Sequence, residues 1–459
     1  MLAEVFQPFV EKSPVSVLAR AAMERLFSAP WINEVFDRTE GRHYTRSLAF
    51  SALFDLMVSV VFKHARSVRR AYLPKASEIA VSLTSVYNKL NGIPPAVPAE
   101  LVRESARASC AVIESIGGRR APDLPGYRTR IVDGNCLAAT QHRIAETRAL
   151  RAGVLPGKSL VVYDPEFGCA IDIVPCEDGH AQERSLFAPL LAMVERGDLW
   201  IADRNFCTRG LLFGIAHDAG ADFIVREHKK LPVVEVGPRK KVGKTPTGRV
   251  EEQDAELVSQ DGKKVLRIRR ITIHLKGQTR DGDRELHVLT SLPKRILATK
   301  VANLYRGRWR IETAFQKLER DLNSEINTLG YPRAALFGFC VALVALNIMA
   351  LVYAALRAVH GEKKIDEEFS HYYLGLELAE THRGMMIAVP EEHWTVFAQM
   401  SDQKFAAHIL KLAKLVDLKS FPKTKRGPKK PPPKKKYRKQ EPHVSTAKLL
   451  AERKAKSFR

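Results

Sequence analysis

The sequence predicts an α/β fold with a mixed sheet, flanked by helical regions on both sides. Between residues 120 and 228, short β-branched runs bounded by Gly, Pro or Asp recur, and two helical stretches (180–197 and 208–220) separate the later ones. The resulting order of three strands, helix, strand, helix, strand is typical of an α/β core. The runs are RTRIVD (128–133), KSLVVYD (158–164), GCAIDIVP (168–175), DLWIAD (198–203) and DFIVRE (222–227). Hydrophobic residues are 45% of the 459, enough for two or three domains.

Residues 1–119 are expected to form a helical region that binds DNA. Apolar clusters such as 48–62 recur there at helical spacing. The segment 77–95 has Ser77 as a candidate N-cap and could be the second helix of a helix-turn-helix, although ordinary helical packing is the more common explanation of such a helix. No basic stretch followed by an apolar one opens the chain, so we expect no signal peptide.

Residues 229–292 interrupt the α/β pattern. Alternating runs such as VLRIRRITIHL are typical of antiparallel strands, so this segment is expected to be a β insertion that divides the core. The first part of the core would then be 120–228 and the second part 293–360, with a long helix from about 299 to 326. A helical C-terminal region is expected over 361–418.

One uncharged segment, from Gly338 to Leu356, is long enough to cross a membrane. Asn347 lies in its middle, no second span is present to pair with it, and the charged helix before it needs an apolar partner. We therefore expect a helix buried on all sides in the core, and no membrane partner.

The formal charge of +23 is concentrated at the C-terminus. Residues 419–459 contain 16 Lys or Arg against two Glu, so this tail is a polycation suited to phosphate backbones. A charge run alone is as often a solvated surface. Its Lys- and Pro-rich sequence predicts a disordered tail until DNA binds.

Several kinds of site are not indicated by the sequence. The six cysteines fall in no metal-ligand spacing, which is typical of reduced thiols in a cytoplasmic protein. The run VGPRKKVGKT (236–245) lacks the spacing of a phosphate-binding loop, so we expect no nucleotide cofactor. Between the first and fourth runs lies an acidic stretch, most of whose members are expected to be hairpin and helix-cap residues, with Asp172 alone as a possible supporting group: Asp164, Glu166, Asp172, Asp178, His180 and Glu183.

Acidic residues end two of the predicted strands, at Asp133 and Asp203. A carboxylate at a strand end projects from a rigid scaffold into the loops, where a ligand can reach it, although Asp is also an ordinary turn residue after a strand. Asp133 and Asp203 are therefore candidate catalytic groups, but their positions alone do not establish a catalytic site.

The helix YRGRWRIETAFQKLE (305–319) is more specific. At about 100° per residue, Tyr305, Arg308 and Glu312 lie on one narrow face, with Glu319 further along it. An Arg–Glu pair on a solvated helix would be worth only a few tenths of a kcal/mol. Gly307 favours a functional interpretation, because Gly costs about 1 kcal/mol relative to Ala inside a helix.

Three carboxylates from two strands and one helix suit phosphodiester chemistry. Such cleavage commonly uses two divalent cations about 4 Å apart, and Mg²⁺ accepts a few carboxylates while keeping several waters. We therefore predict Asp133, Asp203 and Glu312 as catalytic metal ligands. Arg308 would hold the scissile phosphate, and Tyr305 would hydrogen-bond or stack beside it.

At these residues the chain resembles the DDE-type transposases of the IS4 family of bacterial insertion sequences. The family's two aspartates correspond to Asp133 in IVDGN and Asp203 in ADRNF, and its Y-x2-R-x3-E helix to Tyr305, Arg308 and Glu312. The β insertion lies where the family has one, and the resemblance covers about 120–350.

This resemblance implies an RNase H-like core with two Mg²⁺ or Mn²⁺ ions. It also implies a homodimer that pairs two transposon ends, in the cytoplasm of a bacterium and associated with its nucleoid. The expected reaction is cleavage at transposon ends by metal-activated water, followed by attack of the freed 3′-OH on target DNA.

The chain departs from the family pattern in two places. Glu319 stands where the family has a motif lysine; Lys317 projects to the wrong side of the helix, so Arg320 is the better substitute for phosphate positioning. Residues 229–292 contain no Phe, Tyr or Trp on which a flipped base could stack in hairpin chemistry, although His274 or His287 could stack less well.

Two other functions remain open. An RNase H-like nuclease would cut DNA without joining it. A catalytically inactive descendant, in which Glu319 has damaged the site, would bind DNA without cutting it.

Overall fold

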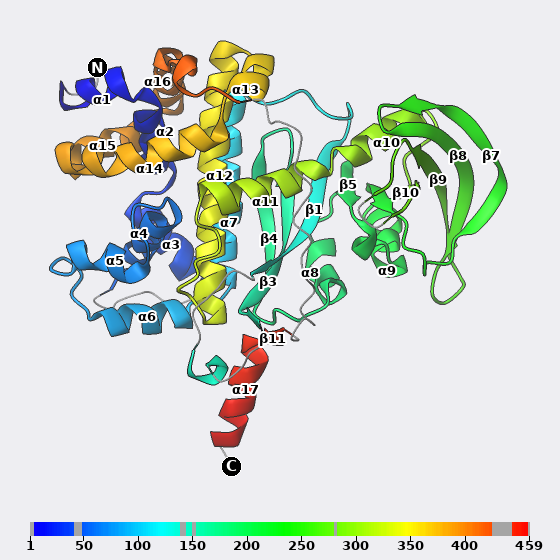
Figure 1. Ribbon diagram of the computed structural model, residues 1–459, viewed down its shortest axis with the longest axis horizontal. Coiled ribbons are helices and arrows are strands. Elements are labelled where there is room, and N and C mark those ends of the chain that lie inside the picture. The colour runs from blue at the N-terminus through cyan, green and yellow to red at the C-terminus, as the bar shows by residue number, and fades with distance from the viewer. Residues whose placement is uncertain are drawn as a thin grey trace.

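The computed structural model describes residues 4–40, 48–137, 144–148, 153–279, 282–424 and 443–457. It confirms the α/β class with a mixed sheet and a helical N-terminal region. In Figure 1, helices from both ends of the chain gather on one side of the sheet, and the insertion strands form the other side of the molecule.

Five strands form the core of the sheet, in the order β4-β3-β1-β5-β6. β1 pairs antiparallel with β3 and parallel with β5; β3 pairs antiparallel with β4, and β5 parallel with β6. These are the strands and the directions expected of an RNase H-like core. Their bounds are β1 Arg128–Leu137, β3 Gly157–Asp164, β4 Cys169–Cys176, β5 Asp198–Ala202 and β6 Asp222–Arg226.

The insertion strands belong to the same sheet. β10 pairs antiparallel with β6, and the sheet then continues through β9 and β8 to β7 at the edge. Their bounds are β7 Val234–Thr245, β8 Gly248–Val258, β9 Val265–Leu275 and β10 Glu285–Thr290. The insertion is thus paired with the core through Val288, Leu289 and Thr290 of β10, which fixes its position beside the core strands.

The predicted helix 299–326 is two helices, which corrects that expectation. α10 spans Ala298–Arg306 and α11 spans Trp309–Asp321. At the junction, Arg308 N bonds to Tyr305 O and Arg310 N to Gly307 O, so the chain tightens to i→i+3 bonds. A Cβ on Gly307 would lie 2.9 Å from Leu304 O, so this break requires glycine.

The predicted helix 180–197 is also shorter than expected, because only a 3-10 turn, Glu183–Leu186, and α8, Phe187–Leu191, are helical there. The second predicted helix forms α9, Arg209–Phe213, followed by a π turn, Gly214–Asp218.

Helices from both ends of the chain pack together beside the sheet, as Figure 1 shows. The N-terminal ones are α1 Gln7–Lys12, α2 Pro14–Leu26, α3 Ala29–Glu40, α4 Phe50–Val61, α5 Val68–Tyr72, α6 Leu83–Gly92 and α7 Ala96–Ser115. The C-terminal ones are α13 Glu362–Glu368, α14 His371–Ala388, α15 Glu391–Gln399 and α16 Asp402–Leu415. Ser82, not Ser77, caps α6, because its side chain accepts a hydrogen bond from Ser85 N.

The apolar segment lies in α12, Pro332–His360, and is a core helix in this structure. It is the one described helix long and apolar enough to cross a membrane, yet its most apolar stretch is completely buried inside the protein. α12 packs against α2, α4 and α7 of the N-terminal region and against α16 of the C-terminal region. Figure 1 shows it between the helical side and the sheet.

Asn347, the polar residue in α12, binds the edge strand of the sheet. Its side chain accepts from Ala170 N at 2.8 Å and donates to Ala170 O at 3.0 Å and to Ser105 Oγ at 2.9 Å. β4 has no further strand beside it, and its pairing with β3 is irregular between Val162 and Tyr163. The buried amide therefore satisfies backbone groups that the sheet leaves unpaired.

Replacing Asn347 with Leu is expected to lower the free energy of unfolding by about 2–4 kcal/mol, because the N–H and C=O of Ala170 would lose their buried partners. Thermal unfolding of the two proteins measures the difference. Ser105→Ala is the matched control, because it removes the bonds of Ser105 with Asn347 and Val102 but leaves both Ala170 groups paired with Asn347. An unfolding midpoint for Asn347→Leu equal to that of Ser105→Ala would contradict this account.

The C-terminal tail is ordered in part, which corrects the prediction over 443–457. β11, Val444–Ser445, pairs in parallel with β2, Val154–Leu155, and α17, Thr446–Ser457, follows it. Ion pairs join Lys448 to Asp178 and Arg453 to Glu146. The Lys- and Pro-rich part of the tail, 425–442, lies outside the described residues.

Candidate active site

Asp133 and Asp203 lie at the same level of the sheet. The parallel pairing of β1 with β5 runs to Ile131 opposite Ile201, and each aspartate follows two residues later. β1 does not end at Asp133 as predicted: it continues to Leu137 along β3. Only β5 ends here, so the side of β1 beyond Ile131 is open to groups from elsewhere in the chain.

Local hydrogen bonds orient both aspartates. Asp133 Oδ1 accepts from Gly134 N at 2.9 Å. Asp203 caps the 3-10 turn Arg204–Phe206, and its Oδ1 accepts from Asn205 N at 2.7 Å. In each case one carboxylate oxygen is held by the backbone, so the direction of the carboxylate is fixed.

Arg308 connects β1 to α11. Its Nη1 donates to Asp133 Oδ2 at 3.1 Å, and its Nη2 donates to Glu312 on the next turn of α11. The guanidinium side chain is only 11% exposed, so both contacts are charge-assisted and largely desolvated. Tyr305 is buried beside it, and burial raises the pKa of the tyrosine, an effect that the positive charge of Arg308 opposes.

The electrostatics show an excess of negative charge. Burial raises the pKa of Asp133 to about 6; Arg308 lowers it, while the negative charges of Asp203 and Glu312 raise it further. Three acidic side chains therefore act on one another, and a single guanidinium partly offsets them. Such a site is suited to additional positive charge.

The donor chemistry fits a divalent metal, although the carboxylates are not gathered into a finished metal cage. Hard cations such as Mg²⁺ take carboxylate oxygens and retain water. Among the described residues, no three His, Cys, Asp or Glu lie close enough together to hold a metal ion. Arg308, which contacts both Asp133 and Glu312, supplies the positive charge between them.

The structure does not bring Arg320 to this site. Its guanidinium pairs with Asp321, at 2.7 Å for the longer of the two contacts. Glu319 is exposed. Lys317 faces away from the carboxylates, as predicted: its Nζ lies 2.9 Å from His371 Nε2, and burial lowers the pKa of the lysine to about 8.

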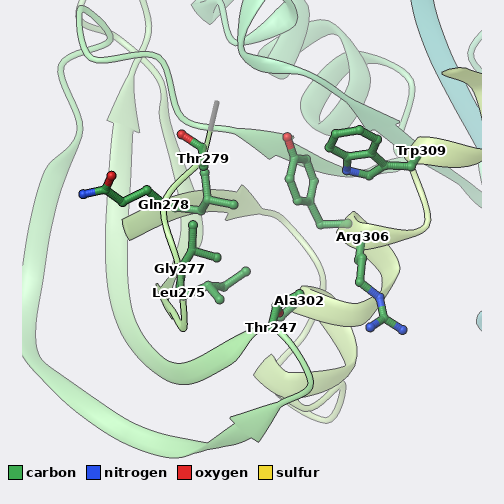
Figure 2. Close-up of a pocket in the computed structure, with 11 residues that line it drawn as sticks. Thr247, Leu275, Gly277, Gln278, Thr279, Ala302, Arg306 and Trp309 are labelled. Carbon is green, nitrogen blue, oxygen red and sulfur yellow. The ribbon is translucent and has the colours of Figure 1, made fainter. Parts of the chain in front are cut away.

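A cavity of about 450 Å³ lies next to the site, between the insertion and the break in the catalytic helix (Figure 2). The sequence interpretation missed Trp309, which lines this cavity with its side chain 60% exposed and lies 6.0 Å from the Arg308 guanidinium. Neither His274 nor His287 lines it. The lining residues are Thr247, Ile273, Leu275, Gly277, Gln278, Thr279, Leu286, Ala302, Tyr305, Arg306 and Trp309.

The cavity changes the interpretation of the insertion. The insertion has no Phe, Tyr or Trp of its own, but the core helix supplies Tyr305 and Trp309 to the space that the insertion encloses. Two features of the sequence could have indicated this arrangement. Trp309 directly follows Arg308, and Gly307 marks the point at which the helix breaks.

Fold and site together define a class of protein. An RNase H-like strand order, aspartates on the first and fourth core strands and a Tyr-Arg-Glu helix after a β insertion are the features of DDE-type transposases. Residues 124–348 match the family described as "Transposase DDE domain". Residues 124–348, just under half of the chain, thus carry a DDE transposase domain, which bears out the resemblance over this part of the chain.

Two proteins that are similar to this chain carry the name transposase. The chain is 31% identical over 201 residues to "Putative transposase y4zB" of Sinorhizobium fredii (strain NBRC 101917 / NGR234). The match covers 42% of this chain and 53% of that protein, so the chain spans about half the length of this relative. A cryo-EM structure of a piggyBac transposase synaptic complex with hairpin DNA aligns over 82% of this chain and 84% of that one, with 10% identity and a TM-score of 0.36. A likeness this low carries no conclusion about this chain.

Proposed function

We propose that the protein is a DNA transposase that cuts at transposon ends and joins the freed strand to target DNA. The observation that supports this most directly is that Asp133, Asp203 and Glu312 come from three separate elements, and that the charges of Asp203 and Glu312 both act on Asp133. Arg308 contacts Asp133 and Glu312. If Arg308 and Glu312 were only an ion pair on a solvent-exposed helix, Arg308 would not also need to contact the buried Asp133 of β1.

Each residue has a defined part in this proposal. Asp133, Asp203 and Glu312 hold two divalent ions, Mg²⁺ or Mn²⁺, which when bound activate the attacking oxygen and stabilise the leaving one. Arg308 exchanges its carboxylate partners for the scissile phosphate, because its planar fork matches phosphate oxygens as well as carboxylates. Tyr305, buried against Arg308, fixes the orientation of the guanidinium group.

DNA is proposed to reach this site from the basic tail and from an exposed helix of the N-terminal region. We infer that the polycationic tail, 419–459, contacts phosphates beside the catalytic core, because its last helix, α17, is joined to the segment between β1 and β3. The N-terminal region offers α6, where Thr84, Ser85 and Asn88 are exposed. The working form is proposed to be a homodimer on two transposon ends.

A strand cleavage and joining assay tests this function. A labelled DNA fragment that carries the transposon end is incubated with protein and Mg²⁺, and products are separated on a denaturing gel. Joined products support the transposase. Cut but unjoined products favour the nuclease, and binding without cutting favours the inactive descendant.

The cavity beside Trp309 is proposed to hold an extrahelical base of the transposon end. Trp309→Ala is expected to weaken capture of that base by about 1–3 kcal/mol, the usual contribution of a base stacked on an aromatic ring. Fluorescence of 2-aminopurine placed next to the cleavage site measures the loss of stacking. Trp309→Phe is the matched control and should retain most of the quenching. Equal fluorescence for wild type and Trp309→Ala would contradict the assignment.

A further inference from the structure

A fourth carboxylate lies at the same edge of the sheet as the three acidic residues above. Glu183 opens the 3-10 turn Glu183–Leu186, which packs against the turn that follows Asp203. The Asn205 side chain lies within hydrogen-bonding reach of the Glu183 carboxylate, and the negative charge of Asp203 acts on that carboxylate. Glu183 is thus a neighbour of Asp203 and not merely a cap of the next helix.

Gly134 makes room for this carboxylate. A Cβ on Gly134 would lie 2.4 Å from Glu183 Oε1 and 3.0 Å from Glu183 Cδ, closer than real contacts allow. Gly134 lies inside β1, and it is not among the glycines with positive φ. Its backbone conformation therefore does not require glycine, but a Cβ at this position would displace the Glu183 carboxylate.

Glu183 approaches from the opposite face of the sheet to α11. Ile131 packs with residues of α10 and α11, whereas Val132 packs with residues of α8 and of the turn after β5. Because successive side chains of a strand point to opposite faces, Asp133 shares the face of Ile131 and Gly134 that of Val132. Acidic groups therefore border the strand ends from both faces.

We propose that Glu183 is a positioning residue of the catalytic site, which accepts hydrogen bonds from the water shell of a divalent ion held at Asp203, and that Gly134 admits it. This inference rests on the proposed function. Mg²⁺ keeps several of its waters when it binds to proteins, and groups that bond to the ligand shell set its affinity and geometry. A carboxylate beyond Asp203 is suited to that task, because it can accept from two waters at once.

Metal binding by the DNA-free protein tests the proposal without reference to catalysis. Titration with Mn²⁺, followed by electron paramagnetic resonance of the free ion, gives a dissociation constant for each variant. Glu183→Gln is expected to bind Mn²⁺ about 10–100-fold more weakly than wild type, the range observed when groups outside the ligand shell are removed. Glu183→Asp should recover part of the loss. Glu195→Gln is the matched control, because the Glu195 side chain is 70% exposed.

A double-mutant cycle isolates the role of the glycine. Gly134→Ala alone should weaken Mn²⁺ binding, because its methyl group displaces the Glu183 carboxylate. In a Glu183→Ala protein the same change should have little further effect, because the collision is gone. Additive losses would overturn the proposed link between the two residues. If Glu183→Gln does not fold, the Mn²⁺ dissociation constants of Gly134→Ala and Glu183→Asp test the proposal in its place.

The outcomes distinguish this inference from the function on which it rests. If Asp203→Asn weakens Mn²⁺ binding but Glu183→Gln does not, the role of Glu183 is overturned and the proposed metal site stands. If neither change affects Mn²⁺ binding, the metal site at Asp203 is itself wrong, and the proposal falls with it. Weaker binding in both variants, with Glu195→Gln unchanged, supports Glu183.

Discussion

Glu312→Gln is expected to reduce strand cleavage by at least about 10³-fold. A bound metal contributes several kcal/mol of charge stabilisation to phosphodiester cleavage, and about 4 kcal/mol corresponds to a thousandfold in rate. Gln keeps the shape of Glu312 but removes the charge that a divalent ion requires. Initial rates of Mg²⁺-dependent cleavage on a labelled transposon end measure the effect, and binding of the same DNA should change little.

The same helix provides the control for this prediction. Glu319 is exposed two turns further along α11, so Glu319→Gln removes an equal charge from the same surface without touching the carboxylate cluster. Cleavage by Glu319→Gln should stay within a few-fold of wild type or rise. A Glu312→Gln protein that cuts as fast as Glu319→Gln would show that Glu312 is not a metal ligand.

Arg308→Gln is expected to lower cleavage by about 10²–10³-fold, the usual effect of removing a donor that stabilises developing charge. Metal binding should change in the opposite direction. Asp133 and Glu312 contact the guanidinium in this structure, so removing it frees both carboxylates for a cation. Mn²⁺ should therefore bind the DNA-free Arg308→Gln protein more tightly than wild type.

Two measurements decide this prediction, because Arg308 could instead be purely structural. A structural role predicts weaker metal binding and a lower unfolding temperature in Arg308→Gln. Arg308→Lys separates charge from shape: Lys restores a positive charge but not the bidentate fork, so cleavage should recover only in part. Full recovery of cleavage with Lys would count against phosphate positioning by the fork.

The parts of the structure that the sequence predicts are those that depend on local patterns. Alternating β-branched runs predict the strands of the core, and the spacing of Tyr305, Arg308 and Glu312 predicts one functional face. Both patterns depend only on strand and helix periodicity. The order of the strands and the place of the insertion follow from the resemblance to a known family.

The parts that the sequence does not predict depend on contacts between distant residues. The hydrogen bonds between Asn347 and Ala170 join residues 177 positions apart, and nothing in the apolar segment indicates its strand partner. Gly134 looks like a turn glycine until Glu183 is placed against it. Trp309 becomes a cavity residue only because the helix breaks at Gly307.

The position of α12 has a consequence for the synthesis of the protein. α2, α4 and α7 leave the ribosome early, but the helix against which they pack is made only after the whole catalytic core, including α11. Domains usually fold in order of synthesis, and here the N-terminal region must wait for residues that emerge much later. A polypeptide that stops before Pro332 has all three acidic residues but lacks the helix that completes its core. The proposed DNA cleavage is therefore expected only once translation has passed His360, the last residue of α12.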